Sequence, residues 1–138
     1  MRIRNSYAEW LSEFEWSYYA TLTTRYRLTM KSARKAVEGL HKQLSKAGNA
    51  VIFFAIEPYD VKEGYHIHAL ILCPNGLKYQ HVISSWQHVS GNKRKPKEGE
   101  HESTWNRVEL QRYNPKLGAR HYVGKYIMKD QSDYDFLH

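Results

Sequence analysis

The sequence contains two histidines separated by one apolar residue, His66-Ile67-His68. They lie in a segment, Tyr65–Leu72, whose composition predicts a β-strand, and side chains two residues apart on a strand share a face. Two neutral imidazoles on one face can bind one metal ion. Glu57 ends the preceding apolar segment, and an antiparallel hairpin would bring its carboxylate beside them. Two imidazoles and one carboxylate leave coordination positions open for water and a phosphate oxygen, which indicates a catalytic metal site rather than a structural one.

A second pattern, Tyr-x-x-Lys, occurs twice in tandem as Tyr122-Val-Gly-Lys125 and Tyr126-Ile-Met-Lys129. On a helix, residues four apart share a face, so the two tyrosines form one row and the two lysines another. A phenol in this position could attack a phosphorus atom while a neighbouring lysine stabilises the negative charge. The same tyrosines would also suit ordinary packing at the border of a core. The local pattern does not choose between the two as nucleophile.

The elements that must position these residues alternate between helices and strands without a regular βαβ series. This order predicts an α+β fold with a central antiparallel β-sheet and helices packed against it. Asn114-Pro115 is a typical helix start, with Asn as the cap and Pro in the first turn. The expected elements are helices over 6–15, 29–48, 77–86 and 114–129 and strands over 18–24, 49–57, 65–72 and 104–112, with a basic loop over 90–103 and a short acidic-aromatic tail.

The composition suits a nucleic-acid partner. The 138 residues carry a net charge of +7, and 14% are aromatic. Neutralising phosphates releases counterions, and aromatic rings among basic residues suit stacking on unpaired bases. The single cysteine, Cys73, excludes an intramolecular disulfide and a cysteine cluster for zinc. No apolar run approaches the ~20 residues of a membrane span, so we expect one intracellular domain with no membrane partner.

Two features are candidates for DNA contacts. Phe53 lies two pleats from Glu57 on the same strand face, where its ring could sit under a base. The loop near residue 95 has four positive charges in five positions, and these would contact phosphates, although a solvated loop with no role explains them equally well. The four charges belong to Lys93, Arg94, Lys95 and Lys97.

Taken in order, the strand Tyr18-Tyr-Ala-Thr-Leu-Thr-Thr24, Glu57, His66-Ile-His68 and Tyr122-Val-Gly-Lys125-Tyr126 resemble the HUH (His-hydrophobic-His) endonuclease superfamily. The resemblance is strongest to rolling-circle replication initiators (Rep proteins) of viruses, phages and plasmids, and it extends from about Tyr18 to Lys129. It implies an antiparallel sheet related to RNA-recognition and ferredoxin-like domains, with the metal site on the open face. It also implies catalytic roles for the two tyrosines and their lysines, Tyr122, Tyr126, Lys125 and Lys129.

The family's reaction is a nick in single-stranded DNA that leaves a covalent 5′-phosphotyrosine and a free 3′-hydroxyl. The resemblance therefore implies Mn²⁺ or Mg²⁺ at Glu57, His66 and His68, and single-stranded or hairpin DNA at a replication origin as substrate. Residues 1–138 would form a single nicking domain with no helicase domain, so a separate helicase and a host polymerase would be needed. The location would be the host cytoplasm, or the nucleus of a eukaryotic host. The sequence leaves open whether the protein is a homodimer.

Other interpretations remain open. A single-tyrosine HUH transposase has a similar length but does not need the tandem Tyr-x-x-Lys pattern. A mobilisation relaxase usually has its tyrosine near the N-terminus, before the histidines. A non-catalytic single-stranded nucleic-acid-binding domain would explain the charge, the aromatic residues and the sheet. It would not explain why Glu57, His66 and His68 suit a metal, unless the histidines are merely two surface residues on a half-exposed strand.

Overall fold

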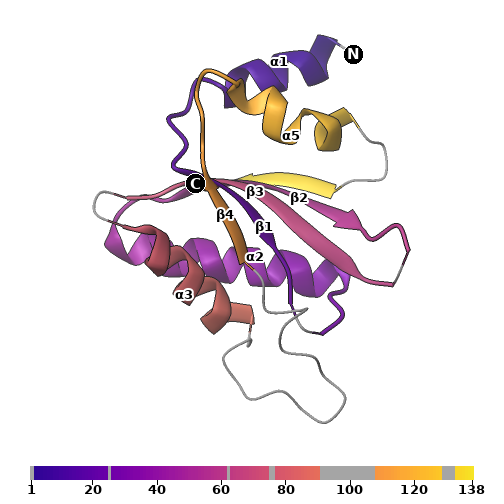
Figure 1. The fold of residues 1–138 in the computed structure, drawn as a ribbon, viewed down its shortest axis with the longest axis vertical. Helices are drawn as coiled ribbons and strands as arrows, with labels where there is room; N and C mark the ends of the chain where they lie inside the picture. Colours follow the sequence, from indigo (N-terminus) through magenta and orange to yellow (C-terminus); the bar gives the residue numbers. More distant parts are fainter. Residues whose placement is uncertain (1, 25, 62, 75–76, 91–107, 129–132) are drawn as a thin grey trace.

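The computed structural model describes residues 2–24, 26–61, 63–74, 77–90, 108–128 and 133–138. Helices and strands alternate along most of this chain (Figure 1). Among the described residues, no helix is both long enough and apolar enough to cross a bilayer. The elements are α1 (Arg2–Leu11), β1 (Tyr18–Leu22), α2 (Met30–Leu44), a 3₁₀ turn η1 (Ser45–Ala47), β2 (Val51–Pro58), β3 (Tyr65–Leu72), α3 (Tyr79–Ser90), β4 (Val108–Arg112), α5 (Gly118–Met128) and β5 (Asp133–Leu137).

The five strands form one sheet in the order β4-β1-β3-β2-β5, and every neighbouring pair is antiparallel. The β2–β3 hairpin is at the centre of the arrangement, with Val51 opposite Leu72 and Pro58 opposite Tyr65. The bounds of β1, β2 and β3 match the strands expected from the sequence to within two residues at each end. The strand expected over 104–112 corresponds to β4, and the first part of that range lies outside the described residues. The predicted α+β fold, with an antiparallel sheet and helices packed against it, is confirmed.

Helices cover both faces of the sheet, with α2 and α3 on one face and α1 and α5 on the other (Figure 1). Alternation along the strands divides the buried side chains between two cores. The first core joins strand residues such as Ile52, Phe54 and Ile67 to the apolar sides of α2 and α3. The second core joins Phe53 and Leu70 to α1 and α5. The sheet face on which the open metal site was expected is therefore largely covered.

The ends of α2 follow from local chemistry. The Thr29 hydroxyl accepts a hydrogen bond from the Ser32 N–H (3.0 Å), and the Ser32 hydroxyl in turn accepts one from the Thr29 N–H (2.8 Å). This capping box satisfies two backbone donors at the helix start. At the other end a 3₁₀ turn leads to Gly48, whose φ of 142° lies in a region that a side chain disfavours. Both predicted boundaries of this helical segment are confirmed.

The start of α5 differs from the prediction. The Asn114 side chain does not cap a helix; its Oδ1 accepts a hydrogen bond from the Lys116 N–H (3.0 Å) and closes a turn. The helix begins only at Gly118, which has a φ of 75°. The Ser12 hydroxyl, from the end of α1, then accepts a hydrogen bond from the Ala119 N–H (2.9 Å). A tertiary contact therefore supplies the cap that the sequence pattern assigned to Asn114.

The C-terminal residues form a strand, β5, where the sequence analysis expected a tail. β5 pairs with β2, with Asp133 opposite Ile56 and Leu137 opposite Ile52. Its side chains alternate, because the Tyr134 and Phe136 rings join the second core while two carboxylates bind Arg34 of α2. The alternation of aromatic and acidic residues was thus a strand signal that the prediction missed.

Candidate metal centre

The β2–β3 pairing brings Glu57, His66 and His68 together. Glu57 lies directly opposite His66, and His68 lies opposite Ala55, two residues back along β2. All three side chains are on the sheet face that α1 and α5 cover, near the connected end of the hairpin, where Pro58 pairs with Tyr65. Each offers a ligand atom, and these atoms lie within 4.8 Å of one another. This geometry follows from strand pairing, as the sequence pattern suggested.

The three side chains are close enough to share one ion, and each remains partly exposed to solvent. The Glu57 Oε1 is 3.3 Å from the His66 Nε2, and the two imidazole rings meet edge to face with centroids 4.7 Å apart. The Glu57 and His66 side chains are each 15% exposed, and His68 is 8% exposed. Two imidazole nitrogens and a carboxylate at this spacing are a donor set that suits Mn²⁺ or Mg²⁺ with open positions for other ligands. The residues present therefore fit the metal that the resemblance implies.

Tyr19 of β1 contacts His68, and the sequence analysis did not identify it. The Tyr19 hydroxyl and the His68 Nδ1 are 2.8 Å apart and share a hydrogen bond, and their rings are nearly parallel (13°). When Nδ1 carries the hydrogen and donates it to the tyrosine oxygen, Nε2 presents its lone pair to a metal. The signal was available, because Tyr19 lies in the predicted first strand, but only strand order places that strand next to β3.

Tyr59 lies against the other histidine. Its ring stacks on His66 with centroids 4.6 Å apart and an angle of 30° between the planes. Burial raises the pKa of the Tyr59 phenol above its usual value, so the ring remains neutral at physiological pH. Glu57, His66 and His68 are called the trio below. Each of its two imidazoles therefore has an aromatic neighbour that restricts its orientation.

Tyr122 is buried in the second core. Its ring packs between those of Tyr19 and Tyr113, with centroids 5.1 Å from each. Its hydroxyl accepts a hydrogen bond from the Asn114 N–H (2.9 Å), at the opposite end of the sheet from Glu57. The Tyr19 ring contacts both Tyr122 and His68 and lies between them. In this conformation the Tyr122 oxygen is directed away from the trio.

Tyr126 lies one turn further along α5 than Tyr122. The direction of the helix over the sheet determines how near this turn lies to Glu57. α5 begins beside Ser12 and ends at Met128, after which the chain returns as β5 with its first residue opposite Ile56. The C-terminal part of α5 therefore lies toward the hairpin end that carries Glu57 (Figure 1). The backbone of Tyr126 and Lys125 belongs to this part of α5, while their side chains and all of Lys129 lie outside the described residues.

The structure contradicts one predicted DNA contact and does not describe the others. Phe53 is fully buried, and its ring contacts Tyr7 of α1 (5.8 Å) and Tyr134 of β5 (6.0 Å). It cannot stack on a base, because the helices that fill the second core cover it. The basic positions of the predicted loop, Lys93, Arg94, Lys95 and Lys97, lie outside the described residues.

Part of the same sheet face remains accessible beside the trio. A hollow of about 280 Å³ lies over β1 and β4, lined by Tyr19, Thr21 and three residues of β4. Thr21 is opposite His68 in the register, so this hollow adjoins the candidate metal centre. Cys73, in contrast, packs against the first core, and burial raises the pKa of its thiol to about 11. It does not belong to the ligand set.

Comparisons with known proteins add no relative: no family model, curated protein or solved structure matches the chain. The case for a function therefore rests on the order of the motifs and on the geometry of the site.

Proposed function

We propose that this protein is a metal-dependent endonuclease that nicks single-stranded DNA through a tyrosine, as HUH replication initiators do. The observation that carries the proposal is the Glu57–His66–His68 trio, whose ligand atoms lie within 4.8 Å of one another on two paired strands. A helix that bears a Tyr-x-x-Lys pattern crosses the same face of the sheet. A non-catalytic binding domain would need neither feature.

The trio would hold one divalent ion, Mn²⁺ or Mg²⁺. Such an ion supplies Lewis-acid polarisation of the phosphate that is attacked. The protein's own contribution is to hold the ligands in place: the hairpin sets their spacing, Tyr19 orients His68, and Tyr59 stacks on His66. The accessible hollow over β1 and β4 is the route by which a single strand could approach.

Tyr126 is the preferred nucleophile in this proposal. The Tyr122 hydroxyl is engaged by the Asn114 backbone, whereas the position of Tyr126 on α5 is nearer the end of the hairpin that carries Glu57. In the reaction the phenolic oxygen bonds to phosphorus and loses its proton to solvent. The bond from phosphorus to the 3′-oxygen breaks, and that oxygen takes up a proton. Lys125 or Lys129 would stabilise the phenolate.

The products are a 5′-phosphotyrosine and a free 3′-hydroxyl, which a polymerase can extend. This outcome suits initiation of rolling-circle replication at single-stranded or hairpin origin DNA, with a separate helicase and a host polymerase. The burial of Tyr122 favours a reaction that uses one tyrosine. A single-tyrosine HUH transposase therefore stays a second candidate, and it would rejoin the cleaved strand to a different DNA end.

The test is a cleavage assay with labelled single-stranded DNA from the protein's own replicon. With Mn²⁺ or Mg²⁺ we expect a nick and a protein–DNA adduct that survives SDS. Excess EDTA should abolish both, because loss of ~3 kcal/mol of barrier lowering slows a reaction about 100-fold. Undiminished cleavage in EDTA would refute the metal centre, and a nick without an adduct would refute the tyrosine mechanism.

A further inference from the structure

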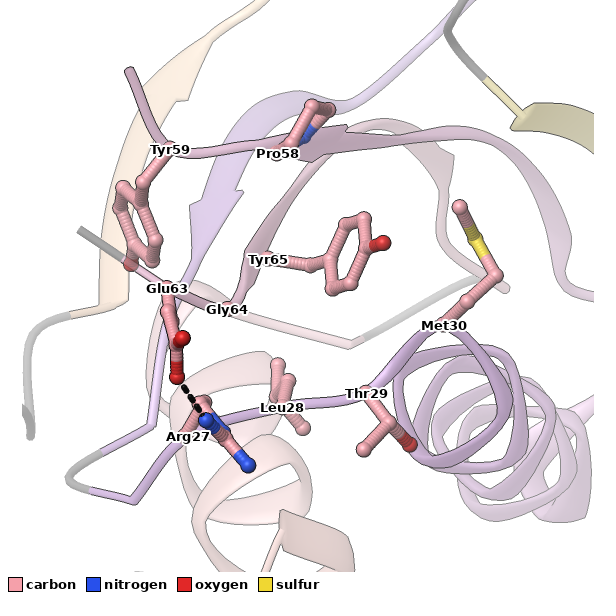
Figure 2. Close-up of a pocket in the computed structure, with 9 residues that line it drawn as sticks. All are labelled: Arg27, Leu28, Thr29, Met30, Pro58, Tyr59, Glu63, Gly64 and Tyr65. Carbon is pink, nitrogen blue, oxygen red and sulfur yellow. Dashed lines mark hydrogen bonds and ion pairs between the residues drawn. The ribbon is translucent and has the colours of Figure 1, made fainter. Parts of the chain in front are cut away.

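A pocket of about 490 Å³ lies at the end of the β2–β3 hairpin, close to the candidate metal centre (Figure 2). One wall is the hairpin, and the other is the segment that leads into α2. The volume is within the range of small-molecule sites and exceeds that of a single nucleobase. The pocket is lined by Arg27, Leu28, Thr29, Met30, Pro58, Tyr59, Glu63, Gly64 and Tyr65.

Tyr59 separates the pocket from the trio of Glu57, His66 and His68. Strand alternation directs Pro58 and Tyr65 to the α2 face, while Glu57 and His66 point to the other face. Tyr59 follows the end of β2, lines the pocket and also stacks on His66 at 4.6 Å. A group bound in the pocket would thus be separated from the trio by one aromatic ring.

The lining combines flat apolar walls with one charged pair. The rings of Tyr59 and Tyr65 and the side chains of Leu28 and Met30 provide apolar surface (Figure 2). Arg27 and Glu63 form an ion pair at the pocket's edge, and their side chains are 60% and 82% exposed. An exposed pair of this kind contributes little to stability, so a ligand can separate its members at low cost.

Gly64 allows Arg27 to lie against the hairpin. Its φ is +106°, and a Cβ added there would lie 2.8 Å from the Arg27 Cγ. The Tyr59 N–H donates to the Gly64 carbonyl (3.1 Å) and closes the turn beneath the arginine. The stem of Arg27 therefore lies against the backbone of the hairpin, and its guanidinium pairs with Glu63 at the pocket edge.

We propose that this pocket binds a guanine base of the single-stranded DNA that the metal centre nicks. The inference rests on the proposed function. Aromatic walls stack on unpaired bases, and an unpaired base exposes all of its edges for hydrogen bonds. Guanine offers two adjacent acceptors, O6 and N7, to an arginine fork and two adjacent donors, on N1 and N2, to a carboxylate. No other DNA base offers both pairs, so Arg27 and Glu63 together select guanine.

The test measures binding without cleavage. Fluorescence anisotropy in EDTA compares a labelled dT12 strand with strands that carry one dG, dA or dC in place of a thymine. We expect the dG strand to bind about tenfold more tightly than dT12, the discrimination typical of one bidentate pair. Arg27→Lys keeps the charge but loses the planar fork, so it should reduce this preference to about twofold or less with dT12 affinity unchanged.

The matched control is Arg112→Lys, the same substitution at an exposed arginine at the opposite end of the sheet. It should retain the full preference for guanine. Equal binding of all four strands, a preference for another base, or a guanine preference that survives Arg27→Lys would overturn the pocket assignment. The nuclease activity is tested separately, by adduct formation. If the protein prefers guanine through Arg27 but forms no adduct, the pocket assignment is supported and the nuclease proposal is refuted. If the protein forms the adduct but shows no base preference, the nuclease proposal is supported and the pocket assignment is refuted.

Discussion

The candidate metal ligands Glu57, His66 and His68 are the residues on which the proposed chemistry depends most directly. We expect Mn²⁺ to raise the melting temperature of the wild-type protein, because a ligand that binds only the folded state at 100 times its Kd stabilises it by about 2.7 kcal/mol. His66→Ala, His68→Ala and Glu57→Gln should each remove most of this shift and abolish nicking. Differential scanning fluorimetry with and without the metal measures the shift.

His41→Ala is the control for these substitutions. His41 is a partly buried histidine whose Nε2 is 2.9 Å from the Ala50 carbonyl, outside the trio. This variant should be less stable yet keep the metal-dependent shift. An equal shift in the three trio variants would show that Mn²⁺ binds elsewhere.

Substitution of the two tyrosines of α5 should affect different properties: stability for Tyr122 and adduct formation for Tyr126. Tyr122→Phe leaves the Asn114 N–H without its 2.9 Å acceptor, so the free energy of unfolding should fall by about 1 kcal/mol while the adduct still forms. Tyr126→Phe should fold normally and form no adduct. Urea denaturation and mass spectrometry of the SDS-stable product measure the two effects. An adduct at Tyr122 in the wild type would reverse the assignment, and an undiminished adduct in the double variant would place the nucleophile elsewhere.

Tyr19 should act through His68 rather than on the DNA. Tyr19→Phe removes the hydroxyl that lies 2.8 Å from Nδ1 but keeps the ring that packs on Tyr122. Loss of such a hydrogen bond to a metal-binding histidine typically weakens metal affinity 10- to 100-fold. We therefore expect nicking to require more Mn²⁺ and to recover at saturating metal. A decrease in the maximal rate, with the metal dependence unchanged, would contradict this positioning role.

At the scale of elements, β5 and α2 are joined by Arg34. Its guanidinium donates to the carboxylates of Asp133 and Asp135 (2.8 Å each) and lies over the Phe54 ring. The hydrogen bond from Arg34 lowers the pKa of the Asp135 carboxyl below its ordinary value of 3.8. A lowered pKa in the folded state adds stability above the ordinary pKa, and this stability is lost as the pH falls through the folded-state pKa.

We expect acid to weaken the attachment of β5 as a consequence. The stability of the wild type should decline as the pH falls below about 4, and Arg34→Met should show a smaller decline because it lacks the ion pair. Thermal melts between pH 2 and 7 test this. Lys35→Met, at an exposed position on the same helix, is the control and should follow the wild type. Identical pH profiles for Arg34→Met and wild type would show that the pair does not couple β5 to α2.

At the scale of the whole molecule, the net charge of +7 predicts DNA binding that weakens with salt. The sequence assigns part of this effect to the basic run that contains Lys93, Arg94, Lys95 and Lys97. Replacing all four by glutamine should flatten the slope of log affinity against log salt by about 0.7 for each single-strand phosphate that the protein no longer neutralises. An unchanged slope would exclude these residues from the binding surface. The same measurement on Arg27→Lys should show no change of slope, because that variant keeps its charge.

Elements whose signals are local could be predicted from the sequence. Thr29 and Ser32 cap α2 through their own side chains, and the spacing of His66 and His68 places both on one face of β3 because strand side chains alternate. The position of Glu57 followed as well, since a short hairpin connection forces antiparallel pairing. Fold class and the candidate ligand set could be predicted for this reason.

Tertiary structure decided everything that depends on which surfaces meet. Phe53 and Glu57 share a strand face, but only the docking of α1, α5 and β5 buries the first and leaves the second near the hairpin end. Tyr122 and Tyr126 carry the same local motif. The direction of α5 over the sheet places the Tyr122 hydroxyl beside Asn114 and the backbone of Tyr126 nearer the hairpin end that carries Glu57. The contact of Tyr19 with His68 depends on strand order, which alternation does not encode. Local patterns leave several packing partners equivalent for each of these residues, and only long-range packing distinguishes the buried Phe53 ring from the candidate ligand Glu57.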